Sequence, residues 1–152
     1  MTRQEDISYD FLENDKIWPP VLIANPQHPF TKALINTLER LPDDAYDEIS
    51  SIISFVVEDS RFAAMNVPFS RQYPSAPKGL EVRFDTIVVF HGALEYTHLA
   101  LVGLIAHEIA HSVVSLPNHI SNEEAADTLI EKWGFGKELE ALRAEQKLRL
   151  SS

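Results

Sequence analysis

The chain has 152 residues, of which 45% are hydrophobic and 24% charged, so residues 1–152 are expected to fold as a single domain rather than to be disordered. It contains no cysteine, which excludes disulfides, thiol catalysis, iron–sulfur clusters and every zinc site that needs thiolate. The formal net charge of −10 disfavours nucleic acid as a partner, because such a surface repels phosphate backbones.

The negative charge is concentrated in the first 60 residues, which hold 4 basic and 12 acidic side chains, whereas residues 61–152 hold 9 and 11. This asymmetry has two interpretations: a solvated acidic face, or an acidic surface that docks on a basic protein partner. Within this half, residues 1–17 are polar and acidic and are predicted to form a loosely ordered arm. No apolar run approaches the roughly 20 residues of a membrane span, and no signal-peptide core follows the start, so a cytoplasmic protein with no membrane partner is expected.

Two helices are predicted next. Thr31 is a candidate N-cap for a helix that runs to about Leu41 and carries Leu34, Ile35 and Leu38 on one face. Pro42 ends this helix, and the two aspartates that follow suit the first turn of a second one. A stripe of apolar side chains with helical spacing extends the second helix to about residue 58; its members are Ile49, Ile52, Ile53, Val56 and Val57.

The middle of the chain favours strands. Residues 61–79 are rich in proline and are predicted to form a short strand or loop. Residues 80–94 are dominated by β-branched and aromatic side chains and predict one or two strands, with a bend or bulge at Asp85-Thr86. The segment Ile87–Phe90 is either the edge of a sheet, where an extended peptide could pair, or an ordinary buried strand.

Three helices are predicted in the C-terminal part. Residues 96–115 are apolar on nearly every side, which is typical of a buried helix. Ser121 begins the next helix, Glu124 completes a capping box, and Gly134 ends it. Residues 137–149 predict a charged surface helix. The sequence therefore predicts an α+β fold, in which a small mixed sheet lies beside the buried helix, with further helices at both ends of the chain.

The buried helix contains the pattern His-Glu-x-x-His at residues 107–111. Residues four apart lie on one helical face, about 40° apart around the axis, so His107 and His111 can reach one metal ion. Glu108 can contact water held on that metal without being a ligand. Zinc lowers the pKa of bound water to about 7, so a carboxylate can take its proton at neutral pH. The alternative is a helix at the surface edge with two hydrogen-bonded histidines.

Zinc needs a third protein ligand, and Glu123, Glu124 and Asp127 all compete. A helical wheel places Ala126 and Ile130 on the buried face, Glu123 at its border and Glu124 on the opposite side. Glu123 is therefore the predicted ligand. Asp127 lies one turn further on and is predicted to accept a hydrogen bond from the far nitrogen of a zinc-bound histidine, which would orient the ring. The alternative for both carboxylates is simply an acidic start of a helix.

The strand, the buried HExxH helix, the short loop and the following NExxxD helix together resemble the zincin metallopeptidases, specifically the gluzincin branch. Residues 122–127, Asn-Glu-Glu-Ala-Ala-Asp, match the gluzincin pattern of a glutamate followed four residues later by an aspartate. Small intracellular proteins of the ImmA/IrrE type are also similar, with HExxH followed by ExxAN or ExxAD. The resemblance covers roughly residues 80–135, which would form the core of the metal site.

This resemblance implies a zincin-like fold with one zinc ion held by His107, His111 and Glu123. It also implies Glu108 as the general base and Asp127 as a residue that supports the ligands. The metzincin pattern is not matched, because valine and proline stand where its glycine and third histidine belong. Peptide deformylase also uses HExxH but needs a cysteine ligand, and the chain contains no cysteine.

The residue that stabilises the transition state is left open by the sequence. Candidates are His91, His98, Tyr73 and Tyr96. His119 is an alternative metal ligand. The alternative for the three histidines is an ordinary exposed or capped side chain.

The sequence thus predicts zinc-dependent hydrolysis of a peptide or protein substrate, with a glutamate as general base. One alternative is a weakly active or inactive scaffold that acts as a regulatory, protein-binding module through the acidic N-terminal half. Another is a structural zinc site, in which His119 or Asp127 closes the fourth coordination position.

Overall fold

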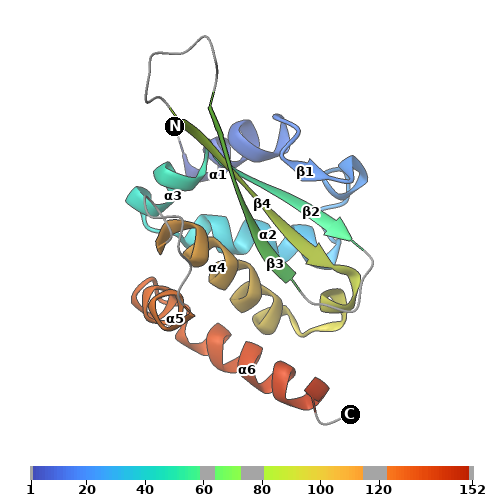
Figure 1. The fold of residues 1–152 in the computed structure, drawn as a ribbon. Coiled ribbons are helices and arrows are strands. Elements are labelled where there is room, and N and C mark those ends of the chain that lie inside the picture. The colour runs from blue at the N-terminus through green and yellow to red at the C-terminus, as the bar shows by residue number, and fades with distance from the viewer. Residues whose placement is uncertain (1, 59–63, 73–80, 115–122, 151–152) are drawn as a thin grey trace.

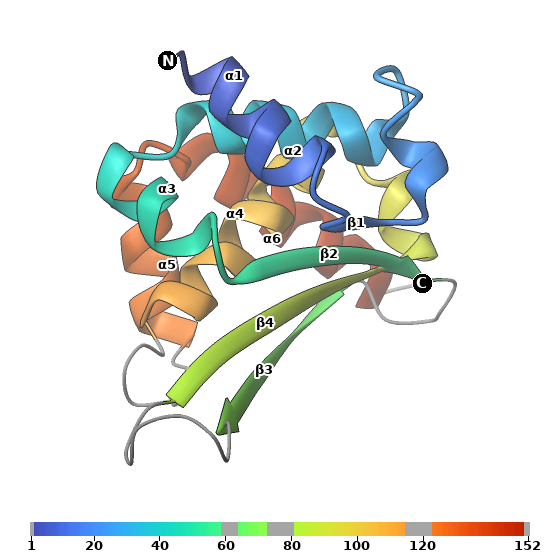
Figure 2. The same ribbon diagram turned by 90° about the horizontal axis from the view of Figure 1, so that it is seen from above.

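The fold is α+β, with a four-stranded sheet whose one face is covered by helices (Figures 1 and 2). The computed structural model describes residues 2–58, 64–72, 81–114 and 123–150. The predicted α+β class and mixed sheet are confirmed.

The sheet contains β1 (Ile17–Trp18), β2 (Ile53–Glu58), β3 (Ala64–Gln72) and β4 (Glu81–Phe90), in the spatial order β1-β2-β4-β3. The strands β1, β2 and β4 are parallel, and β3 runs antiparallel to β4. Burial alternates along the central strands, because successive side chains point to opposite faces. The buried apolar side chains on the face towards the helices include Ile53, Phe55, Ile87 and Val89.

The strand β4 lies inside the sheet, so the interpretation of Ile87–Phe90 as a sheet edge is wrong. Ile87 is paired with Phe55 of β2 on one side and with Asn66 of β3 on the other. The pairing continues without interruption through Asp85, so the bend or bulge predicted there is also wrong. Among the described strands, β3 is the antiparallel edge strand.

The helix predicted to reach residue 58 is instead a short helix followed by a strand. The helix α3 (Asp43–Ile49) is followed by β2. The residues that suggested a helical stripe are mostly β-branched, and such side chains pack well on a pleated surface. Pairing with β4, which is distant in the sequence, makes this segment a strand rather than a helix.

The helix α2 (Pro29–Arg40) begins before its predicted cap. The N-cap is His28, whose Nδ1 accepts a hydrogen bond of 3.2 Å from the backbone N–H of Phe30. Pro29 suits the first helical position, because an N–H there would have no partner within the helix and proline has no N–H. Thr31 is buried and donates its hydroxyl to the carbonyl of Leu22 at 2.7 Å. Thr31 is therefore not the cap, contrary to the sequence-based prediction.

The N-terminal segment is packed, and the prediction of a loosely ordered arm over residues 1–17 is wrong. The helix α1 (Arg3–Ile7) continues into a π-helical turn, η1 (Ser8–Leu12), and then into β1. Ile7 and Phe11 are four residues apart and thus share one helical face, which is buried. Ile7, Phe11 and Ile17 of this acidic segment therefore turn towards the core, whereas Tyr9 is exposed.

Aromatic contacts and hydrogen bonds attach this segment to the rest of the chain. The ring of Phe11 lies 6.1 Å, centroid to centroid, from those of Tyr46 and Phe55. The guanidinium of Arg3 donates hydrogen bonds of 2.9 Å to the carbonyls of Leu38 and Leu41, at the end of α2.

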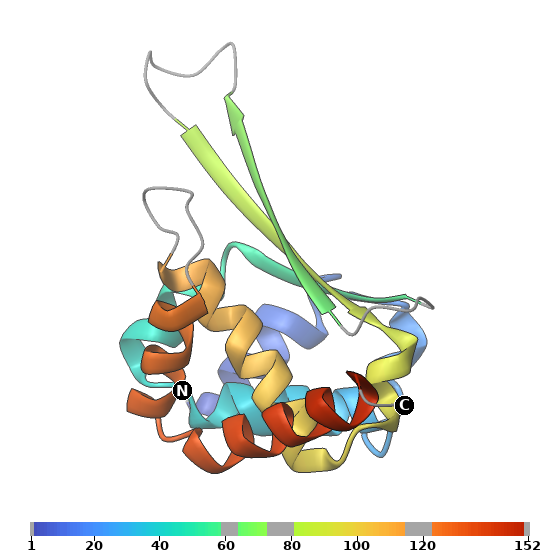
Figure 3. The same cartoon turned by 60° about the horizontal axis from the view of Figure 1, so that its bottom comes forward.

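The C-terminal helices are α4 (His98–Val114), α5 (Glu123–Lys132) and α6 (Gly136–Leu150), with short 3-10 turns η2 (Pro20–Leu22) and η3 (His91–Glu95) elsewhere. The buried α4 crosses the helical layer, flanked by α5 and α6 (Figure 3). Gly134 has a φ of 93° and ends α5 as predicted. Within the described residues, no helix has both the length and the apolar character needed to cross a bilayer.

The predicted surface helix α6 has a buried face as well as a charged one. Leu139 and Leu142 are buried, and the backbone of α6 approaches α4 very closely at Gly103. A Cβ atom added to Gly103 would lie 2.3 Å from the carbonyl oxygen of Glu138. This contact fixes α6 against the helix that carries the HExxH motif.

Candidate metal centre

The two histidines of the motif lie side by side on α4, in the core of the protein. His107 and His111 are only 5% and 6% exposed. Their ring centroids are 4.5 Å apart and the rings are nearly perpendicular, at 89°. Their spacing of four residues on one helix brings the rings together, as the sequence predicts.

The third predicted ligand comes from α5. Its buried residues Ala126 and Ile130 pack this helix against α4, and Glu123 stands at its first turn. Glu123 Oε2 lies 3.1 Å from His107 Nε2, and Glu123 Oε1 lies 2.8 Å from His111 Nε2. The structure therefore brings together all three predicted ligands, and their ligand atoms lie within 4.8 Å of one another.

This donor set fits a zinc ion. Two imidazole nitrogens and one carboxylate oxygen are the ligands of many catalytic zinc sites. With metal–ligand bonds of about 2.0–2.2 Å, tetrahedral donors lie roughly 3.3–3.6 Å apart. The two histidine–Glu123 distances, 3.1 Å from His107 to Oε2 and 2.8 Å from His111 to Oε1, are shorter than this, so metal binding requires a small outward movement of Glu123. Glu123 can make it because 67% of its side chain is exposed.

Glu108 is buried and lies next to the site rather than in the ligand cluster. Its Oε1 is 3.7 Å from Nδ1 of His107, the ring nitrogen that does not contact Glu123. This position agrees with the prediction that Glu108 is not a ligand. It leaves the carboxylate close to the atoms that could hold a metal ion.

The protonation of His107 reflects two opposing influences. Burial lowers its pKa, but the adjacent Glu108 carboxylate and the charges of Glu123 and Asp127 outweigh this effect and raise the pKa above 6.5. In the metal-free protein, a proton and a metal ion compete for this ring. Metal binding is therefore expected to weaken as the pH falls through the raised pKa of His107.

Asp127 lies in the site, but at a different nitrogen from the one predicted. Its Oδ1 is 3.1 Å from Nε2 of His107, the same atom that faces Glu123. The far nitrogen, Nδ1, has Glu108 as its neighbour instead. The physical reason is that α5 packs on the ligand face of α4, so carboxylates one turn apart on α5 approach the same edge of the ring.

Arg143 of α6 is the site residue that the sequence analysis misses. Its Nη2 donates to both carboxylate oxygens of Asp127, at 2.7 and 2.6 Å, and lies 3.7 Å from Glu123 Oε2. Its Nη1 donates to Gln146 Oε1 at 2.9 Å. No motif marks this arginine, because its contact with Asp127 depends on how α5 and α6 pack.

The described candidates for transition-state stabilisation are not near the ligands. His98 begins α4, nine residues before His107, which corresponds to about 14 Å along the helix axis. Tyr96 lies at the same end of α4, with Arg149 over its ring at 4.8 Å. The described part of the chain does not include Tyr73, His119 or the side chain of His91. It also does not include Ser121, the N-cap of the predicted capping box.

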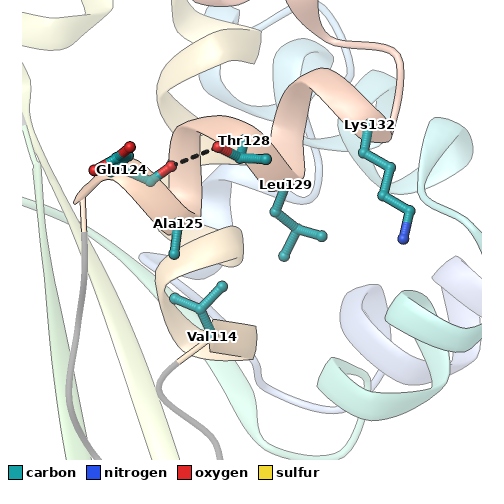
Figure 4. Close-up of a pocket in the computed structure, with 6 residues that line it drawn as sticks. All are labelled: Val114, Glu124, Ala125, Thr128, Leu129 and Lys132. Carbon is teal, nitrogen blue, oxygen red and sulfur yellow. Dashed lines mark hydrogen bonds between the residues drawn. The ribbon is translucent and has the colours of Figure 1, made fainter.

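Glu124 faces away from the candidate metal ligands, as the helical wheel predicts. It borders a pocket of about 500 Å³ on the other side of α5 (Figure 4). Thr128 donates its hydroxyl to the Glu124 carbonyl along this face at 2.9 Å. The pocket is completed by Val114, Ala125, Leu129 and Lys132 and is not part of the metal centre.

No protein-family model, curated protein or solved structure matches the chain. The structure itself establishes an α+β fold and a cluster of His107, His111 and Glu123 that could hold a metal ion.

Proposed function

We propose that the protein is a zinc-dependent peptidase of zincin-like architecture. The observation that carries this proposal is the convergence of two buried imidazole Nε2 atoms on one exposed carboxylate, at 2.8 and 3.1 Å. His107, His111 and Glu123 would hold one zinc ion. A zinc ion bound there would polarise a carbonyl group and lower the pKa of a water molecule.

In this proposal Glu108 is the general base. Its carboxylate accepts a proton from the attacking water and later delivers it to the departing amine. Two features suit it to this role: it follows the ligand His107 directly in α4, and it is buried, so bulk water screens its charge little. The exposed side of the site, at Glu123, provides the route by which a substrate reaches these residues.

The proposed substrate is an extended peptide segment. The edge strand β3 packs across α4, the helix that carries the histidines, and projects with β4 beyond the helical layer (Figure 3). An extended chain could add to this edge through main-chain hydrogen bonds. This role replaces the one that the sequence suggested for β4.

Hydrolysis of a library of unstructured peptides, followed by mass spectrometry, tests this function. We expect new peptide termini with the zinc-loaded protein. Cleavage should stop when a chelator removes the metal and return when zinc is added in place of the chelator. A zinc-loaded protein that cleaves no member of the library would contradict the proposal.

A regulatory, protein-binding role is the second candidate, and one surface feature favours it. Asp6, Glu39, Asp43 and Asp47 line a hollow of about 680 Å³ together with Arg3. This hollow belongs to the acidic N-terminal half and suits a basic partner. This role would be favoured over the peptidase if the protein hydrolysed no peptide and if its free energy of unfolding did not change when metal was removed.

A further inference from the structure

We propose that Arg143 holds Asp127 back from the metal and so keeps one coordination position open. This inference rests on the proposed function, because it requires a metal at His107, His111 and Glu123. It concerns a positioning residue, since Arg143 would act through Asp127.

Asp127 is as close to His107 as the predicted glutamate ligand is. Asp127 Oδ1 and Glu123 Oε2 both lie 3.1 Å from His107 Nε2. An unrestrained Asp127 could therefore become a fourth protein ligand. Structural zinc sites are closed by four protein ligands, whereas catalytic sites keep one position for water or substrate. The position of this one carboxylate thus decides which kind of site the protein has.

The contacts of Arg143 favour the open site. Its Nη2 donates to both oxygens of Asp127, at 2.7 and 2.6 Å, but is 3.7 Å from the nearer oxygen of Glu123. A carboxylate with both oxygens bonded to a cation has less negative charge to offer a metal. The arginine therefore restrains Asp127 much more strongly than Glu123, which remains available as a ligand.

Arg143 is itself held in place. Its Nη1 donates to Gln146 Oε1 at 2.9 Å, one turn further along α6. The neighbouring residues Leu139 and Leu142 are buried and fix α6 against the rest of the helical layer. The guanidinium is thus anchored by a helix that contributes no metal ligand.

Cobalt spectroscopy tests this inference without relying on hydrolysis. Co²⁺ would be bound to the wild-type protein, to Arg143→Met and to Arg143→Met/Asp127→Ala, and each sample titrated with azide, a small anion that occupies open metal positions. We expect azide to change the visible spectrum of the wild type. In Arg143→Met, Asp127 should bind the metal as a fourth protein ligand, so the azide response should disappear and Co²⁺ should bind more tightly.

The double variant separates this role from a general effect of positive charge. If Arg143 only attracts anions, azide should not change the visible spectrum of the double variant either. If Arg143 restrains Asp127, the response should return. Arg143→Lys keeps the positive charge and a donor nitrogen, so it should retain an azide response. If Arg143→Met does not fold, Arg143→Gln takes its place.

The possible failures are distinguishable. A wild-type protein that binds no Co²⁺ would overturn both the proposed function and this inference. Three results would overturn the inference alone: Co²⁺ binding by the wild type without an azide response, a wild-type response in Arg143→Met, or a double variant that stays unresponsive.

Discussion

Replacing Glu108 with glutamine is expected to lower the rate of peptide hydrolysis by about 10²–10⁴-fold and to leave metal binding unchanged. Glutamine has nearly the same shape as glutamate but cannot accept the proton that the mechanism requires. Metal binding should persist because Glu108 lies outside the ligand cluster. Cleavage rates of a peptide substrate and metal content, measured on the same preparations, check both parts of this prediction.

Glu124→Gln is the matched control for this experiment. It makes the same chemical change on the face of α5 that borders the pocket in Figure 4, away from the ligands. Both activity and metal content should stay at the wild-type level. A Glu108→Gln protein that hydrolyses peptides as fast as the wild type would exclude Glu108 as the general base.

Replacing Gly103 with alanine is expected to destabilise the protein by about 3 kcal/mol, because it overpacks the contact between α4 and α6. The new Cβ would lie 2.3 Å from the carbonyl oxygen and 2.8 Å from the carbonyl carbon of Glu138, and backbone atoms cannot move aside like a flexible side chain. Helix propensity alone favours alanine by roughly 0.5–1 kcal/mol. The steric cost should therefore reverse the usual sign of a glycine-to-alanine change.

Gly136→Ala provides the comparison. A Cβ at Gly136, the first residue of α6, would meet no heavy atom within 4 Å. This change should stabilise the protein by about 0.4–1 kcal/mol, by reducing the entropy of the unfolded chain. Chemical denaturation followed by circular dichroism measures both variants. Equal stability of the two would show that α4 and α6 are not in such close contact.

The sequence predicts the site best where the position of a residue follows from the pattern of its own helix. His107 and His111 face the same way because of the helical repeat alone, and the apolar residues around them predict the burial of α4. Glu123 could be chosen over Glu124 because the buried side of α5 is visible in its pattern, at Ala126 and Ile130. The HExxH motif and helical periodicity thus predict that these three candidate ligands lie together, without any knowledge of the fold.

Features that depend on contacts between distant segments were not predictable in this way. A short β-branched run such as β2 fits both a helix and a strand, and only its pairing with β4 decides. Strand order is not encoded locally either, so the sequence could not show that β3 is the edge strand. The contact of Arg143 with Asp127 similarly depends on the packing of two helices.

The N-terminal segment shows a different limit. Its acidic composition suggests weak order, but Ile7 and Phe11 are spaced to share one buried face. A few correctly spaced apolar residues can attach a mostly polar segment to a core. Average composition does not reveal this.

The most direct test of the metal centre is the zinc content of protein purified without a histidine tag or chelator. Wild type, His107→Ala and His98→Ala should be compared. His98 is the matched control, because it is an exposed histidine at the other end of α4. We expect about one zinc ion per chain in the wild type and in His98→Ala, and none in His107→Ala. Wild-type protein that contains no metal and takes up none from added zinc would contradict the metal centre and the peptidase function built on it.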